Sequence, residues 1–168
     1  YKEKRQMVVE RDELNITNAL IKISREFDPV VYFLTVVGEA DINSRENDGL
    51  KFIFEAMKSS AIDVRTFNLR SGQEIPFDAK TIILWGPKDK LMPAEVSMVE
   101  RFLARGGNLL LAIDPDLNLD AHREMRDLLY KYHINQRNDL VIDRKSFVNG
   151  SNGSIPLFDT YNKDLVMT

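Results

Sequence analysis

The chain contains no cysteine. This absence excludes thiol nucleophiles, Cys-ligated zinc, iron–sulfur clusters and disulfide scaffolds. It also has little excess charge, since 23 Lys and Arg face 26 Asp and Glu for a net charge of −3. A general nucleic-acid binder carries a basic field or stripe, so we expect no nucleic-acid partner. No apolar run approaches the roughly 20 residues of a membrane-spanning helix.

Phosphate-binding loops are missing as well. The first apolar run is followed by Gly38 alone, with Glu39 and Asp41 beside it, where a dinucleotide-binding loop needs three spaced glycines. The Gly-Lys-Ser or Gly-Lys-Thr of a P-loop does not occur. We therefore expect neither a nucleotide site of these kinds nor a cofactor.

What is present is an alternation of two periodicities. The 168 residues are 43% hydrophobic and 29% charged, as in a globular domain. Continuous or alternating apolar runs predict strands at residues 30–37, 63–68, 81–85, 108–113 and 140–143. Apolar residues at helical spacing predict helices around residues 50–57, 93–105 and 125–132. A shorter helix over residues 17–24 and a strand-like piece over residues 7–9 precede them.

Alternating strands and helices predict parallel strands joined by crossover helices. We expect an α/β fold, a three-layer sandwich with a mainly parallel sheet of the flavodoxin or amidotransferase type. Residues 1–168 are expected to form a single domain with a core of about residues 30–143. Residues 30–37 and 108–113 both indicate strands buried on two faces. The connection over residues 69–80 is too short and polar for a regular helix.

Local signals suggest where two helices begin or end. Asn47 and Asp48 are N-cap candidates for the first crossover helix. Pro93 suits the first turn of the next, and Gly106-Gly107 suits a left-handed C-terminal cap.

The edge where the strands end is the expected functional region, because open parallel sheets bind ligands beyond the carboxyl ends of their strands. Six residues on the predicted loops are the candidates for ligand contact: Glu39, Asp41, Ser71, Lys88, Asp114 and Asp116.

The acidic residues after the fourth predicted strand have more than one interpretation. Asp114, Asp116, Asn118 and Asp120 offer oxygens at alternate positions, as a hard cation requires. An Asp-x-Asp at a strand end is also typical of aspartyl-phosphate chemistry. The calcium-loop pattern fails because Leu119 stands where glycine is needed. We interpret the segment as a turn and a helix cap, with no metal, and keep a metal-dependent hydrolase or phosphatase using Asp114 and Asp116 as the alternative.

An ordered set of motifs carries a resemblance to a known family. The segments are YFLT at residues 32–35 before Gly38-Glu39, WGPKDKLMPAE at 85–95, FLARGGNLL at 102–110 and IDP at 113–115. Together they resemble the auxiliary domain of bacterial ABC-2-type transport systems, the family that includes the gliding-motility transporter component. The resemblance extends from about Ile16 to Asp143.

The resemblance implies a non-catalytic, extracytoplasmic binding or scaffolding domain, with ABC permease and ATPase subunits as partners and a role in gliding motility or export. It also implies a periplasmic location, anchored in the inner membrane by segments of a longer chain outside these residues. The family's fold is similar to class I glutamine amidotransferase-like domains without their catalytic machinery. A glycan or small ligand is a further candidate for the loop edge. The family often has His before Gly-Glu, where this chain has Val37.

Overall fold

The computed structural model describes residues 5–8, 10–25, 29–35, 41–46, 49–60, 62–114, 122–137 and 139–158. In chain order its elements are α1 (Glu13–Ser24), β1 (Val30–Thr35), α2 (Lys51–Ser59), β2 (Asp63–Asn68), the 3-10 turn η1 (Leu69–Ser71), β3 (Ala79–Trp85), α3 (Pro93–Ala104), β4 (Asn108–Ala112) and α4 (Arg123–Lys131).

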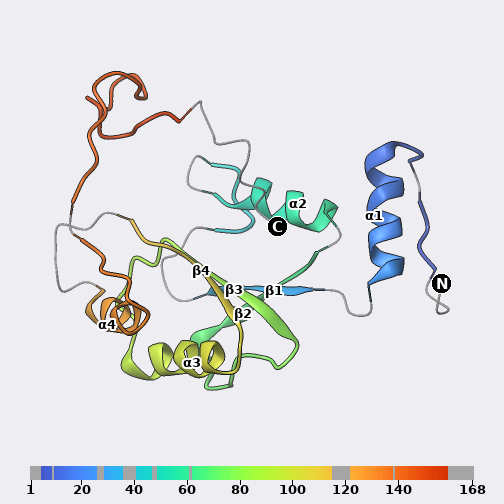
Figure 1. Ribbon diagram of the computed structural model, residues 1–168, viewed down its shortest axis with the longest axis horizontal. Coiled ribbons are helices and arrows are strands. Elements are labelled where there is room, and N and C mark those ends of the chain that lie inside the picture. The colour runs from blue at the N-terminus through green and yellow to red at the C-terminus, as the bar shows by residue number, and fades with distance from the viewer. Residues whose placement is uncertain are drawn as a thin grey trace.

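The four strands form one parallel sheet in the order β2-β1-β3-β4. Helix α2 covers one face, whereas α3 and α4 lie side by side on the other (Figure 1). The predicted three-layer α/β sandwich with a parallel sheet is thereby confirmed. No helix within the described ranges combines the length and apolar character of a membrane span.

Strand β1 shows why its sequence is apolar at successive positions. Val31 and Phe33 belong to the core on the α2 face, together with Leu50 of the loop that precedes α2. Tyr32 and Leu34 join the larger core under α3 and α4. A strand covered on both faces has no polar side, which is the origin of the continuous run.

Helix α3 has the predicted ends. Pro93 occupies its first turn, and Gly106 follows the helix with φ at +88°, the left-handed conformation that favours glycine. Gly107 is required for a different reason, because a Cβ there would lie 2.2 Å from ring carbons of Phe102. The residue therefore allows the chain to pass directly over the buried Phe102 ring into β4.

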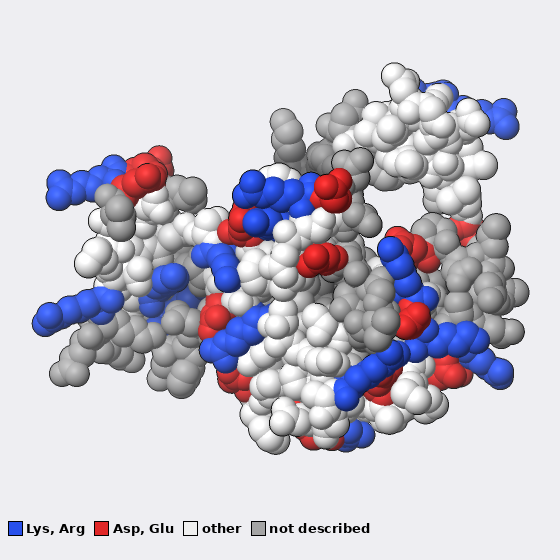
Figure 2. Space-filling view, turned by 180° about the vertical axis from the view of Figure 1, so that it is seen from behind, with Lys and Arg blue, Asp and Glu red and all other residues white. Residues whose placement is uncertain are grey.

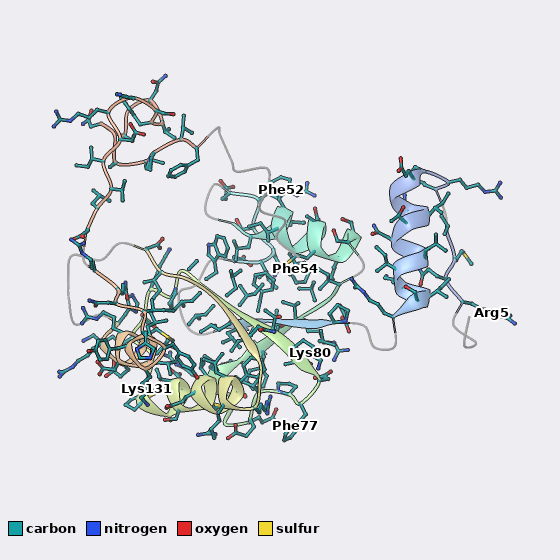
Figure 3. The ribbon with its side chains drawn as sticks, viewed as in Figure 1. Arg5, Phe52, Phe54, Phe77, Lys80 and Lys131 are labelled. Carbon is teal, nitrogen blue, oxygen red and sulfur yellow. The ribbon has the colours of Figure 1, made fainter. Side chains whose placement is uncertain are left out.

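Helix α2 lacks the predicted cap. Its N-cap is Leu50, which has no side-chain capping bond, and Asn47 and Asp48 lie outside the described residues. Phe54 on α2 tilts against Phe33 of β1 with ring centroids 5.9 Å apart, while Phe52 is exposed (Figure 3). Packing on the sheet thus stabilises α2 in place of a cap.

The amino-terminal helix is longer than predicted. Helix α1 begins at Glu13, because Asp12 serves as its N-cap and accepts a hydrogen bond from the Asn15 amide at 2.7 Å. Asn18 Nδ2 donates to the Ser59 carbonyl at the end of α2 at 2.7 Å. The strand-like piece predicted at residues 7–9 is absent over residues 7 and 8, and residue 9 is not described.

Two expectations at the other side of the sheet are wrong. Among the strands that the structure describes, β4 is an edge strand, and it is only partly buried, with Leu110 48% exposed. Residues 140–143 do not form a strand, and Asp143 N donates instead to the Gly153 carbonyl at 3.0 Å. An apolar run indicates strand propensity, but the order of strands in the sheet decides which of them has a neighbour on each side.

The connection between β2 and β3 is as predicted. It consists of the short turn η1 followed by residues 72–78, which form neither helix nor strand. Gly72 after η1 has φ at +74°.

Candidate functional site

The carboxyl ends of the four parallel strands form one edge of the sheet, called here the rim. The chain leaves β1 toward β2 through α2 on one face, and leaves β3 toward β4 through α3 on the other face. The sheet therefore has its topological switch point between β1 and β3, where open α/β sheets form their ligand crevice.

A cavity of about 340 Å³ lies at this switch point. It is called the rim pocket, and the described residues that line it are Phe33, Leu34, Thr35, Asp41, Ile42, Asn43, Leu50, Thr66 and Trp85. Strands β1, β2 and β3 and the loop before α2 each contribute to it. The parallel pairing of Thr35 with Asn68 at the ends of β1 and β2 aligns these contributions.

Asp41 is the predicted candidate among the described residues that line the rim pocket. Its carboxylate accepts a hydrogen bond from the Asn43 amide at 2.8 Å, and its carbonyl accepts one from the Leu50 amide at 2.9 Å. These bonds hold Asp41 next to Asn43 and Leu50 in the loop before α2. Asp41 thus shapes one wall of the pocket.

The other described residues of the lining are uncharged. Thr35, Asn43 and Thr66 carry donors and acceptors, and the partly buried Trp85 offers an indole face and its N–H. Asp41 is the one charged residue among the described lining residues. The described lining therefore offers hydrogen-bonding groups that suit an uncharged, hydroxyl-bearing ligand, and those residues include no cation for a phosphate.

The α3 side of the rim is held by a buried carboxylate. Glu95, in the first turn of α3, is 3% exposed and accepts Arg70 Nε at 2.8 Å. Its other oxygen accepts the Met92 amide at 2.7 Å. A guanidinium nitrogen of Arg70 also lies 3.9 Å from the carboxylate of Asp89. The loops after β2 and β3 are thus fixed to one another and to the start of α3.

Ser71 and Lys88 lie on these two connected loops. Ser71 is exposed, and its hydroxyl accepts the Gln73 amide at 3.3 Å. Lys88 is exposed next to the buried Pro87. Arg70 therefore brings the segments of these two candidates together, on the opposite side of the sheet from Asp41.

Asp114 is exposed two residues beyond β4. Its Oδ2 lies 3.5 Å from the position that a Cβ on Gly86 would occupy. Over the described ranges, no three His, Asp or Glu side chains gather closely enough to hold a metal ion. The candidates Glu39 and Asp116 lie outside the described residues.

Sequence reasoning missed Thr35, Thr66 and Trp85 as pocket residues and Glu95 as a buried group. Trp85 ends the strand predicted at residues 81–85, a signal that could have identified it, whereas Thr35 lies two residues before the end of the strand predicted at residues 30–37. Thr66 and Glu95 carried no such signal, because their roles depend on partners distant in the chain.

A family model described as an ABC-type uncharacterized transport system matches residues 28–156. This match spans all four strands and the whole rim. No curated protein matches the chain.

Proposed function

The chain belongs to the family of ABC-type uncharacterized transport systems, an auxiliary domain of such a system, and on that premise we propose that it is a non-catalytic, extracytoplasmic binding or scaffolding domain. Its proposed partners are the ABC permease and ATPase subunits of the same system. We place it in the periplasm, anchored in the inner membrane by segments outside residues 1–168, with gliding motility or export as the process served.

One observation carries the proposal, namely that two carboxylates of the described rim, Glu95 and Asp41, are engaged in hydrogen bonds that shape its loops. Glu95 is occupied by Arg70 and the Met92 amide, and Asp41 by Asn43. A general acid or base needs access to a reacting group. Carboxylates committed to loop geometry favour a preformed docking edge over a catalytic centre.

The surface charge supports recognition by shape and local pairing. Lys and Arg are interspersed with Asp and Glu over the face seen in Figure 2, in keeping with the net charge of −3. A surface of this kind gives no strong long-range steering. Contact with a membrane-bound partner would instead depend on the loops at the rim.

Affinity purification of the full-length chain from its native membranes tests the partnership. The permease and ATPase should be recovered with the unsubstituted chain and lost or strongly reduced with Lys88→Glu. Lys80→Glu is the matched control, because Lys80 is also exposed but is the second residue of β3, at the amino end of the sheet and away from the rim (Figure 3). Equal recovery with both variants, or no transporter subunit with any of them, would contradict the proposal.

The alternative hydrolase has its own test. Asp114 is exposed at the rim, where a metal-dependent nucleophile would be placed. We expect calorimetric titration with Mg²⁺ or Mn²⁺ to give the same heat for the unsubstituted chain and for Asp114→Asn. A binding heat that is present in the unsubstituted chain and lost in Asp114→Asn would indicate a metal site at Asp114. Such heat, together with turnover of a phosphate ester, would favour the enzyme.

A further inference from the structure

The two outer strands of the described sheet, β2 and β4, differ in how they are protected from pairing with a further strand. At the β2 edge, Arg65 donates to Asp78 at 2.7 Å and to Asp63 at 2.5 Å. Charged side chains on an edge strand discourage further strand pairing. The opposite edge strand, β4, reads Asn-Leu-Leu-Leu-Ala and carries no charge. An apolar edge of this kind requires a cover.

An apolar groove of about 680 Å³ lies between β4 and α4. Leu109, Leu111 and Ile113 line it from the β4 side, and Leu128 lines it from α4. Ile134 and Gln136, which follow α4, also line the groove. The chain leaving α4 therefore already runs beside β4 before it reaches residue 139.

The segment that follows has the composition and length of a missing strand. Leu140, Val141 and Ile142 are 52%, 68% and 57% exposed, although β-branched and aliphatic residues favour a packed, pleated surface. Residues 139–143 match the five residues of β4 in length. In Figure 1 this part of the chain lies away from the sheet, on the way to the loops of residues 144–158.

The hand of the fold specifies where this segment belongs. The crossover from β3 to β4 passes through α3, and α4 lies beside α3 on the same face. Strand–helix–strand crossovers in parallel sheets share one hand. A crossover through α4 with that hand delivers the next strand to the outer edge of β4, parallel to it.

We infer that residues 139–143, which are irregular and largely exposed in this structure, have a second arrangement in which they dock on β4 as a fifth parallel strand, with Leu140 and Ile142 in the groove and Val141 paired with Leu110. Docking would cover the apolar edge and remove three exposed aliphatic side chains from water. It would also carry Asp143 and Arg144 to the rim next to Asp114, because parallel strands end at the same edge. The fifth strand therefore extends the rim beyond the residues that the four-stranded sheet supplies.

The inference does not depend on the proposed function and is tested by engineered disulfides in the full-length chain. Residues 1–168 contain no cysteine, so introduced thiols have no competitor there. Neighbouring strands lie about 4.8 Å apart, within the Cα separation that a disulfide accepts. Leu110→Cys with Val141→Cys should form an intramolecular disulfide under mild oxidation. Leu110→Cys with Val148→Cys, five residues beyond the strand, is the matched control and should not.

Three cross-linking results would overturn the inference. One is equal cross-linking in the test and control pairs, and another is no cross-link in either. A covalent dimer in place of a cross-linked monomer would identify a second copy as the occupant.

Amide hydrogen exchange of the unsubstituted chain tests the same docking without substitutions, so its result does not depend on whether the cysteine variants fold. Residues 140–142 should exchange roughly tenfold or more slowly than an unstructured segment, and fast exchange there would contradict docking.

Discussion

Arg70 and Glu95 join the loop after β2 to the first turn of α3 through a hydrogen bond of 2.8 Å between Nε and Oε1. Glu95 is 3% exposed, whereas the Arg70 side chain is 34% exposed. The pair is thus a buried carboxylate under a partly solvated guanidinium. It joins the segments that carry Ser71 and Lys88 at the rim.

The first prediction concerns this pair. Glu95→Ala should lower the free energy of unfolding by about 2 kcal/mol, because hydrogen bonds to a buried charged group are lost from both Arg70 and the Met92 amide. Urea denaturation followed by circular dichroism measures the change.

Glu74→Ala is the matched control for Glu95→Ala. Glu74 also accepts an arginine, since Arg101 lies 2.6 Å away, but both side chains are more than half exposed. Its loss should cost at most about 1 kcal/mol, as for other surface pairs. Equal effects of the two substitutions would show that burial of Glu95 does not matter.

Local signals in the sequence accounted for most of the fold. The run at residues 30–37 predicted β1, and Pro93 with Gly106 predicted both ends of α3, because these signals act within a few residues. Glu95 could not be recognised in this way. It occupies a helix position typical of an exposed glutamate, and its burial depends on Arg70 from another strand connection.

The remaining differences also have non-local causes. The run at residues 108–113 resembles that of β1, yet β4 is an edge strand because the chain order places no described strand outside it. The sequence predicted that the candidate site lies at the carboxyl ends of the strands, which is the rim. Sequence alone did not show that Asp41 lies on the α2 side while Ser71 and Lys88 lie on the α3 side.

A second prediction tests the passage from α3 into β4. Gly107→Ala should destabilise the fold by about 2 kcal/mol, because the added methyl meets the buried Phe102 ring and overpacks the core. Gly106→Asn is the control, because asparagine tolerates the left-handed conformation and a Cβ at residue 106 meets no atom within 4 Å. Thermal unfolding of the two variants should separate them. A neutral Gly107→Ala would contradict the close approach to Phe102.

A third prediction concerns pH and the turn after residue 143. Hydrogen bonds from the Lys145 and Ser146 amides, at 2.7 and 3.2 Å, lower the pKa of the Asp143 carboxyl. A lowered pKa in the folded state means that the charged form stabilises the turn. That contribution is present above the ordinary pKa of about 3.9 and is lost as pH falls through the lowered value.

Carboxyl NMR titration of Asp143 measures this shift directly. The Lys145 amide resonance should follow the same titration, and Asp143→Asn should abolish that dependence. An Asp143 carboxyl that titrates at or above the ordinary value would contradict the turn.

The central claim is that the rim, and not the amino end of the strands, contacts the transport system. Site-specific photo-cross-linking in native membranes tests it most directly, with the reactive residue at Asn43 or Lys88 on the rim and at Phe77 or Lys80 at the amino end. The account predicts covalent adducts with the permease or ATPase from the two rim positions and none from the two amino-end positions. Adducts from Phe77 or Lys80 alone, or from all four positions equally, would contradict it.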